Sequence, residues 1–81
     1  MKRLSHKTAI YLDSEALKMV NYSEKEETLE ATFNNGRTYH YLKVPKTLWK
    51  NFVAVIKSGE SAGAFINQQI KPFYKVIEIH N

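Results

Sequence analysis

Two groups of side chains in this sequence could take part in binding or catalysis. The first is the tripeptide Tyr39-His40-Tyr41, in which an imidazole lies between two phenols. The second is a set of cations around one indole: Lys46, Trp49, Lys50 and Lys57. Proteins bind single-stranded nucleic acids with cations that contact phosphates and aromatic rings that stack on bases. An imidazole can act as a general base when a substrate and a tuning neighbour lie within reach.

The positive charge lies mostly in the C-terminal half of the chain. The sequence has 12 Lys and Arg residues, 8 Asp and Glu residues and a formal net charge of +4. Residues 36–81 hold seven basic and two acidic side chains, a net charge of +5, whereas residues 1–35 carry a net charge of −1. This asymmetry is typical of proteins that bind polyanions, although a basic surface also keeps a small protein soluble. Because only two cations are arginines, we expect phosphate contacts with little sequence preference.

These observations predict a small non-catalytic module that binds RNA or another nucleic acid. We expect its binding face to contain one arginine, five lysines and the tryptophan: Arg37, Lys43, Lys46, Trp49, Lys50, Lys57 and Lys71. Tyr39 and Tyr41 could stack on bases or pack inside the fold, and we favour packing, with their hydroxyls reaching for solvent or a partner. The alternative is a protein-interaction module in which Trp49, Val53 and a sheet edge form an apolar patch.

Catalysis and metal binding find little support in the sequence. A small basic nuclease could use His40 with Tyr39 or Tyr41, but no acid–base pair is evident. Glu30 or Thr32 could lie diagonal to the histidine, and nothing in the sequence establishes a dyad. We therefore interpret His40 as an exposed histidine on a strand and assign no catalytic residue. The three histidines lack a short metal-ligand spacing and the chain has no cysteine, so we expect neither a metal nor another cofactor.

Length and composition indicate one small cytoplasmic domain. Eighty-one residues, of which 43% are hydrophobic and 25% charged, are typical of a single globular unit. Without cysteine, packing alone must stabilise the fold, which favours a reducing compartment. The longest apolar run, residues 52–56, is too short to cross a membrane, and no apolar signal segment follows the basic first residues. We expect residues 1–13 to form a lead-in with a short strand and residues 14–81 to form the domain.

Alternating apolar and polar residues on both sides of an Asn-Gly turn predict a central β-hairpin. A two-residue loop would place Tyr39 and Tyr41 on its polar face. A three-residue loop, with Gly36 in the left-handed conformation, would instead pair Ala31 with Tyr39 and Leu29 with Tyr41. We favour the three-residue loop because it puts both tyrosines on the apolar face.

Helical periodicity follows the hairpin. Pro45 opens a helix that stops at Ser58-Gly59, where glycine fits a C-terminal cap, and Ser61 caps a second helix that continues to Ile70. Gly63 borders the buried face of the second helix and would allow a close approach to its neighbour. The remaining strands are expected at residues 8–12, 17–22 and 73–79. The sequence therefore predicts an α+β fold: a small antiparallel sheet of three to four strands with a central hairpin, packed on one face by two α-helices, with a C-terminal strand.

The order of several short motifs resembles the KTSC domain, a family named for its occurrence at the C-terminus of some lysyl-tRNA synthetases. The motifs lie between Ser14 and Tyr74 and are Val20-Asn21-Tyr22, Leu29 to Phe33, Gly36, Tyr39-His40-Tyr41, Val44-Pro45, Ser61 to Asn67 and Ile70. The resemblance implies that the domain also occurs as a small stand-alone protein in bacteria and their phages, as this chain would be. The resemblance implies the same fold and RNA binding, and it carries over no catalytic residue. This chain departs from the pattern by its lead-in and by the histidine between the motif tyrosines.

Overall fold

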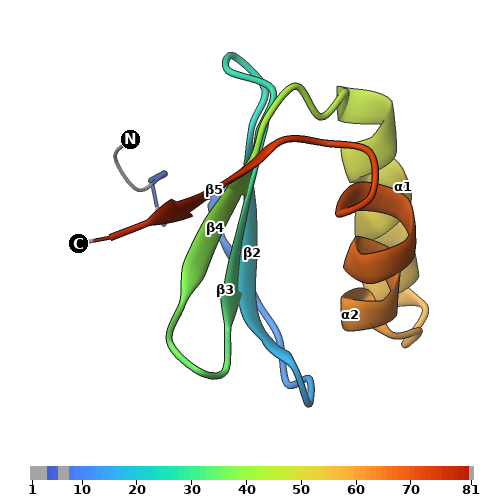
Figure 1. The fold of residues 1–81 in the computed structure, drawn as a ribbon. Helices are drawn as coiled ribbons and strands as arrows, with labels where there is room; N and C mark the ends of the chain where they lie inside the picture. Colours follow the sequence, from blue (N-terminus) through green and yellow to red (C-terminus); the bar gives the residue numbers. More distant parts are fainter. Residues whose placement is uncertain (1–3, 6–7, 81) are drawn as a thin grey trace.

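A sheet and two helices form two layers in the computed structural model, which describes residues 4–5 and 8–80. Figure 1 shows both helices on one face of the sheet. The described strands are antiparallel and lie in the order β1-β2-β3-β4-β5. Their bounds are β1 (Ile10–Tyr11), β2 (Leu17–Ser23), β3 (Thr28–Phe33), β4 (Thr38–Tyr41) and β5 (Val76–Ile79). The helical segments are α1 (Lys46–Lys57), α2 (Ala62–Phe65) and a π-helical continuation, η2 (Ile66–Ile70). The predicted α+β architecture is confirmed, with a strand count slightly higher than expected. No helix in the described ranges has the length and apolar character needed to cross a membrane.

The central hairpin has the register that its hydrophobic pattern favours. Ala31 lies opposite Tyr39 and Leu29 lies opposite Tyr41. Gly36 has a φ of +88°, a left-handed conformation that glycine adopts freely and that strains other residues. Both tyrosines belong to the packed layer between sheet and helices, so the prediction of a three-residue loop is confirmed.

The core lies between the sheet and the helices. Phe52 of α1 is fully buried, as are Ile66 and Ile70 of the second helix and Leu29 of β3. The ring of Phe52 also stacks on that of Phe65, with centroids 4.9 Å apart. Burying a side chain of this size contributes about 1.5–3 kcal/mol relative to leaving it exposed. These contacts therefore hold the two helices on the sheet.

The junction between the helices has the predicted caps. Gly59 follows α1 with a φ of +83°. The Oγ of Ser61 accepts a hydrogen bond from the N–H of Ala64 at 3.1 Å and so caps α2. Gly63 is buried, and a Cβ atom at this position would lie 3.4 Å from the Cβ of Ala16. Glycine therefore lets the second helix approach the segment before β2 closely.

The second helix departs from the prediction in its last turn. Residues 66–70 are π-helical, and the N–H of Lys71 donates to the carbonyl of Ile66 at 2.7 Å. Pro72 has no N–H and cannot continue a helical hydrogen-bond ladder. The last turn of the helix is therefore closed by the hydrogen bond from Lys71 to Ile66, which spans five residues, and the helix ends there.

The last strand is shorter than predicted. The N–H groups of Phe73 and Tyr74 both donate to the carbonyl of Ile70 at 3.1 Å. These bonds hold the backbone in a turn, so the strand expected from Phe73 begins only at Val76.

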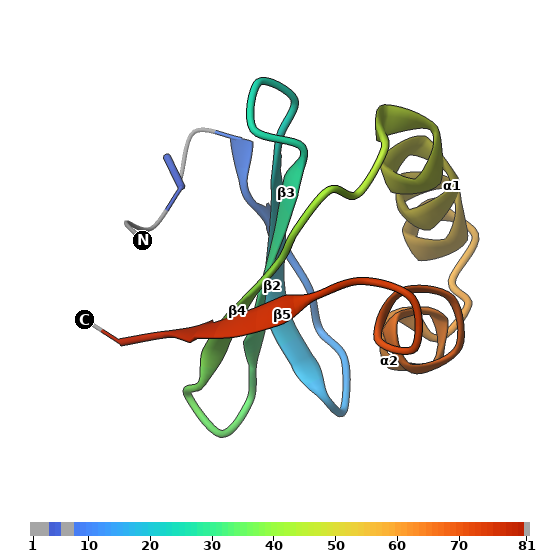
Figure 2. The same ribbon diagram turned by 45° about the horizontal axis from the view of Figure 1, so that its top comes forward.

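Described residues of the lead-in, Leu4, Ser5 and Thr8, cover part of the second face of the sheet. The N–H of Leu4 donates to Oε2 of Glu30 at 3.1 Å, and Nδ2 of Asn21 donates to the carbonyl of Ser5 at 2.9 Å. The hydroxyl of Thr8 donates to Oδ1 of Asn21 at 2.6 Å. Figure 2 shows the described residues that precede β1 and the helices on opposite sides of the sheet.

His40 is buried beneath this lead-in, so the prediction of an exposed histidine is wrong. The residue lies directly opposite Glu30, not diagonal to it. Its Nε2 atom is 2.8 Å from Oε2 of Glu30, and the two side chains are 0% and 1% exposed. The alternation placed His40 on the polar face correctly, but it gave no sign that another segment covers that face.

Candidate nucleic-acid interface

The predicted cations of α1 differ in their surroundings. Lys50 and Lys57 are exposed, whereas Nζ of Lys46 lies 3.0 Å from Oε1 of Glu24 in the β2–β3 turn. Both members of this pair are at least half exposed, so the pair contributes only about 0–1 kcal/mol to stability. It nevertheless neutralises one of the cations expected to contact phosphate.

Trp49 packs into the fold. Its ring stacks on that of Tyr22, with centroids 5.3 Å apart and an interplanar angle of 11°. Its edge meets the ring of Phe52, with centroids 6.0 Å apart. Because stacking on a base needs an accessible ring face, this half-buried indole is a poorer platform than the sequence suggests.

The three other predicted cations lie in three separate connections of the chain. Arg37 lies in the β3–β4 loop, whereas Lys43 lies in the β4–α1 loop and Lys71 follows η2. Figure 1 shows the β3–β4 loop at the opposite end of the sheet from the β4–α1 loop. The predicted binding residues therefore do not form a single face.

Lys43 and Lys71 lie close to an exposed aromatic ring. Phe73 is 72% exposed and stands between Lys71 and Lys75 in the chain. The N–H of Leu42 donates to the carbonyl of Lys75 at 2.9 Å, which joins this turn to the β4–α1 loop. A hollow of about 490 Å³ is lined by Leu42, Lys43, Phe73, Tyr74 and Lys75. We use the name basic aromatic end for Lys43, Lys71, Phe73, Tyr74 and Lys75.

The cations of the basic aromatic end are available to an anion. Lys43, Lys71 and Lys75 are exposed, and no carboxylate within residues 4–5 and 8–80 forms an ion pair with them. They differ in this respect from Lys46. This end of the molecule therefore combines free ammonium groups with an accessible ring.

A second hollow, which we call the tyrosine cleft, borders the same turn. It has a volume of about 280 Å³ and is lined by Phe33, Asn35, Tyr39, Tyr41, Asn67, Lys71 and Val76. Phe33 and Tyr39 meet edge to face, with ring centroids 5.6 Å apart. Both motif tyrosines are thus packed in the fold and still line a hollow.

The tyrosine cleft combines phenol hydroxyls with positive charge. Desolvation by burial, with a smaller effect of Tyr39, raises the pKa of Tyr41 above its ordinary value of 10. Beside the cleft, the hydrogen bond to Tyr39 and the Glu78 carboxylate raise the pKa of Arg37. None of the residues that line the cleft is acidic, so the site favours an anionic or neutral polar ligand.

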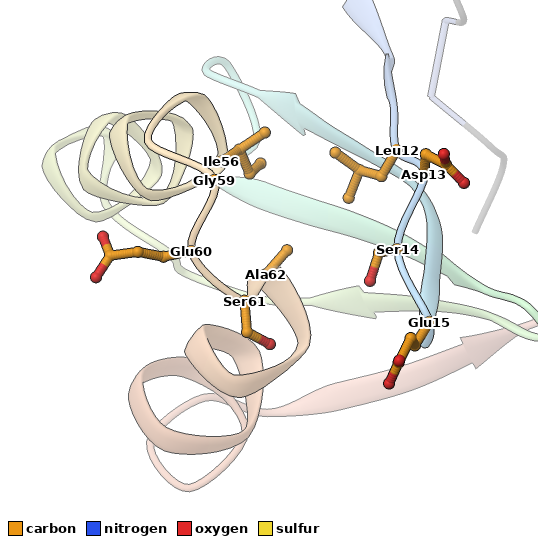
Figure 3. A pocket seen from close by; sticks show the side chains of 9 residues that line it. All are labelled: Leu12, Asp13, Ser14, Glu15, Ile56, Gly59, Glu60, Ser61 and Ala62. Atoms are coloured by element: carbon orange, nitrogen blue, oxygen red, sulfur yellow. The ribbon is translucent and has the colours of Figure 1, made fainter.

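A third hollow, the acidic cleft, has the opposite charge. It has a volume of about 410 Å³, lies between the segment after β1 and the α1–α2 connection, and includes Asp13, Glu15 and Glu60. Figure 3 shows these three carboxylates pointing in different directions. Within the described ranges, no group of three or more His, Cys, Asp or Glu residues could hold a metal ion. The negative charge of this cleft would repel a polyanion.

The residues of the alternative nuclease lie on opposite faces of the sheet. Tyr39 and Tyr41 face the helices, whereas His40 faces the lead-in and is buried with Glu30. A general base must come within hydrogen-bonding reach of its substrate. The geometry therefore does not support a catalytic site made of His40 and either tyrosine.

Phe73 and Lys75 are not among the binding residues predicted from the sequence. Both lie in a segment expected to be a regular strand, in which an aromatic side chain is usually half-buried. The signal that could have found them is the order Lys71-Pro72-Phe73-Tyr74-Lys75, because a proline after a helix indicates a turn that exposes the residues following it.

The chain resembles known proteins over most of its length. Residues 13–74 match the family model described as the KTSC domain. A protein of Tsukamurella paurometabola is 29% identical over 68 residues, which cover 84% of this chain and 96% of that protein. The crystal structure of the KTSC domain protein YPO2434 from Yersinia pestis is similar, with a TM-score of 0.76 and 27% identity, and covers 89% of this chain and 96% of that one. The chain therefore belongs to the KTSC domain family.

Proposed function

We propose that this protein is a small non-catalytic module that binds single-stranded RNA, or another single-stranded nucleic acid, through the basic aromatic end. The exposed ring of Phe73 between Lys71 and Lys75 supports this most directly. A base stacked on such a ring contributes about 1–3 kcal/mol, and the neighbouring ammonium groups can contact the phosphates. The synthetase context implied by the family resemblance agrees with this function. A cytoplasmic location in a bacterium or its phage is part of the same proposal.

The other predicted cations support binding at longer range. Arg37, Lys50 and Lys57 line neither the hollow of the basic aromatic end nor the tyrosine cleft, but they add to the net charge of +5 carried by residues 36–81. A positive field of this kind raises the association rate of a polyanion and weakens with salt. We therefore assign these residues to attraction and the basic aromatic end to contact.

Fluorescence anisotropy with a labelled single-stranded oligoribonucleotide at two salt concentrations tests the proposal. Three phosphate contacts, from Lys43, Lys71 and Lys75, predict that log affinity falls with log salt concentration at a slope of about −2. Absence of binding at low salt would overturn the proposed function.

Two variants with matched controls locate the contact surface. Phe73→Ala should weaken binding about fivefold or more, because it removes a stacking platform. Tyr11→Ala removes another exposed ring, 68% exposed and on β1, and should leave the affinity unchanged. Lys71→Gln should make the salt slope shallower by about 0.7, whereas Lys57→Gln, the same charge change at the end of α1, should alter the slope little.

The outer position of β5 favours a protein partner as the second candidate. Among the described strands, β5 pairs with β4 alone, and its Val76 is 43% exposed. An edge strand can accept a strand from another chain. Trp49 contributes less to such a surface than the sequence suggests, because it stacks on Tyr22. Sedimentation that depends on protein concentration and not on salt would favour this candidate over nucleic-acid binding.

A further inference from the structure

We propose that the tyrosine cleft holds one nucleobase of the strand whose phosphates contact the basic aromatic end. This inference rests on the proposed function and adds a second point of contact to it. The two surfaces are continuous, because Lys71 and Val76 line the cleft while Phe73, Tyr74 and Lys75 line the adjoining hollow. A strand that crosses this turn can therefore place neighbouring nucleotides on both.

The walls of the cleft suit a flat heterocycle. Phe33, Tyr39, Tyr41 and Val76 supply aromatic and aliphatic surface, on which any base can rest through its π-face. The edge-to-face contact of Phe33 and Tyr39 fixes the orientation of those rings. The walls are thus built before a ligand arrives, which lowers the entropic cost of binding.

Asn67 can supply hydrogen bonds that distinguish one base from another. It lies on η2, is exposed, and its side chain makes no hydrogen bond to the residues that the structure describes. A carboxamide offers a donor and an acceptor side by side, the arrangement that pairs with N6 and N7 of adenine. The cleft is therefore expected to favour adenine over the other bases.

Size and charge limit the ligand to a single nucleotide. The volume of about 280 Å³ lies just below the range of about 300–1,000 Å³ that is common for ligand sites, so the cleft has room for one base and not for several. Lys71 places an ammonium group among the lining residues, where it can contact the phosphate of that nucleotide. The acidic cleft is larger but is lined by carboxylates, which would repel a phosphate. It therefore serves as a negative control within the same molecule.

An NMR titration of the whole protein with adenosine 5′-monophosphate tests the inference directly. The NMR signals of the Asn67 side-chain amide and of the backbone amides of residues 39–41 should shift at millimolar ligand. The reason is that the ring current of an aromatic base changes the local magnetic field in the cleft. Ribose 5-phosphate, which has no base, should shift only the surroundings of Lys71. The segment 13–15 of the acidic cleft should not move with either compound.

A pair of variants on the same helical segment gives the matched control. Asn67→Ala should weaken binding of adenosine 5′-monophosphate about fivefold or more, as expected for the loss of a paired contact to a base. Gln69→Ala removes an exposed carboxamide two residues away that lines a different hollow, and should have no effect. Equal behaviour of the two variants would overturn the role of Asn67.

The outcomes separate this inference from the proposed function. If the oligoribonucleotide binds but adenosine 5′-monophosphate leaves residues 39–41 and Asn67 unshifted, the base site is overturned and the proposed function stands. If N-acetyltryptophanamide shifts the cleft as strongly as the nucleotide does, the cleft accepts aromatic protein side chains and the nucleobase assignment is overturned. If the oligoribonucleotide does not bind, both proposals fall.

Discussion

The two faces of the sheet are both buried, but their chemistry is different. Towards the helices, Leu29, Ala31 and Tyr41 pack in an apolar core, whereas Asn21, Glu30 and His40 lie buried on the other face. The helices cover the first face with side chains, while the lead-in covers the second with backbone and hydroxyl groups. The comparison shows that a polar face of a small sheet can be interior when a short segment supplies its hydrogen-bond partners.

The two faces should respond differently to substitution. Apolar packing accepts another apolar side chain of similar volume at a modest cost. A buried hydrogen-bonded pair depends on both partners, since the loss of one removes part of what compensates the other for its lost hydration. We therefore expect the face of the sheet towards the helices to tolerate replacement by an apolar side chain of similar volume. We expect the same kind of replacement to destabilise the face towards the lead-in.

The largest effect is expected at the centre of the helix face. Phe52→Ala should lower the free energy of unfolding by about 3–5 kcal/mol, because it removes a fully buried ring that stacks on Phe65. Phe52→Leu should cost clearly less, since leucine fills part of the cavity. Urea unfolding measures both, and equal losses would contradict the tolerance of this face.

On the lead-in face, His40→Leu should cost about 3 kcal/mol even though leucine is apolar and of similar size. The change deprives the buried Glu30 carboxylate of a partner at 2.8 Å. The double variant Glu30→Leu/His40→Leu should lose less than the sum of the two single variants, because neither member of the pair is then left buried without the other. Additive losses in a double-mutant cycle would show that the pair is not coupled.

Alkaline pH should weaken the helix face through Tyr41. Burial raises the pKa of its phenol in the folded protein above the ordinary value of 10, which applies to the unfolded chain. The stability that the neutral phenol contributes is therefore complete below pH 10 and is lost as the pH rises from 10 through the raised pKa of the folded state. Tyr41→Phe should therefore make the decline of the melting temperature above pH 10 shallower. Tyr11→Phe, at an exposed position, is the control, and an equal change in both variants would refute the assignment.

A smaller loss is expected where the lead-in meets the sheet. Thr8→Ala removes the 2.6 Å hydrogen bond to Asn21 and should cost about 1 kcal/mol. Exchange of the Asn21 side-chain amide protons, measured by NMR, should accelerate in this variant. Unchanged exchange would mean that Thr8 does not hold the lead-in in place.

The smallest effect is expected for the exposed ion pair. Lys46→Ala should change the free energy of unfolding by less than about 1 kcal/mol, because its contact with Glu24 is in solvent. Calorimetry at low and high salt should give nearly the same value. A loss as large as that of His40→Leu would erase the distinction between exposed and buried pairs.

The sequence predicted the elements well because their signals are local. The loop at Gly36, the cap at Ser61 and the end of α1 before Gly59 each depend on residues within a few positions of one another. The hairpin register followed from the hydrophobic pattern in the same way.

The site could be predicted only in part because it depends on contacts between distant segments. A helical wheel places Lys46 and Trp49 side by side, but it cannot show that Glu24 and Tyr22 lie against them. Alternation likewise assigned His40 to a face without showing what covers that face. The exposure of Phe73 depends on where the helix ends, which Pro72 and the π-helical turn decide together.

The order of the strands also shapes how the protein folds. Each strand pairs with the one before it in the chain, and β1 to β4 are joined by short connections. Their pairings involve small sequence separations, which is the condition for rapid folding. The last strand, β5, is separated from its partner β4 by both helices. Closing that long loop costs more chain entropy than closing the short ones. We expect β5 to join the sheet last, and the turn that carries Phe73 to take its final form only in that step.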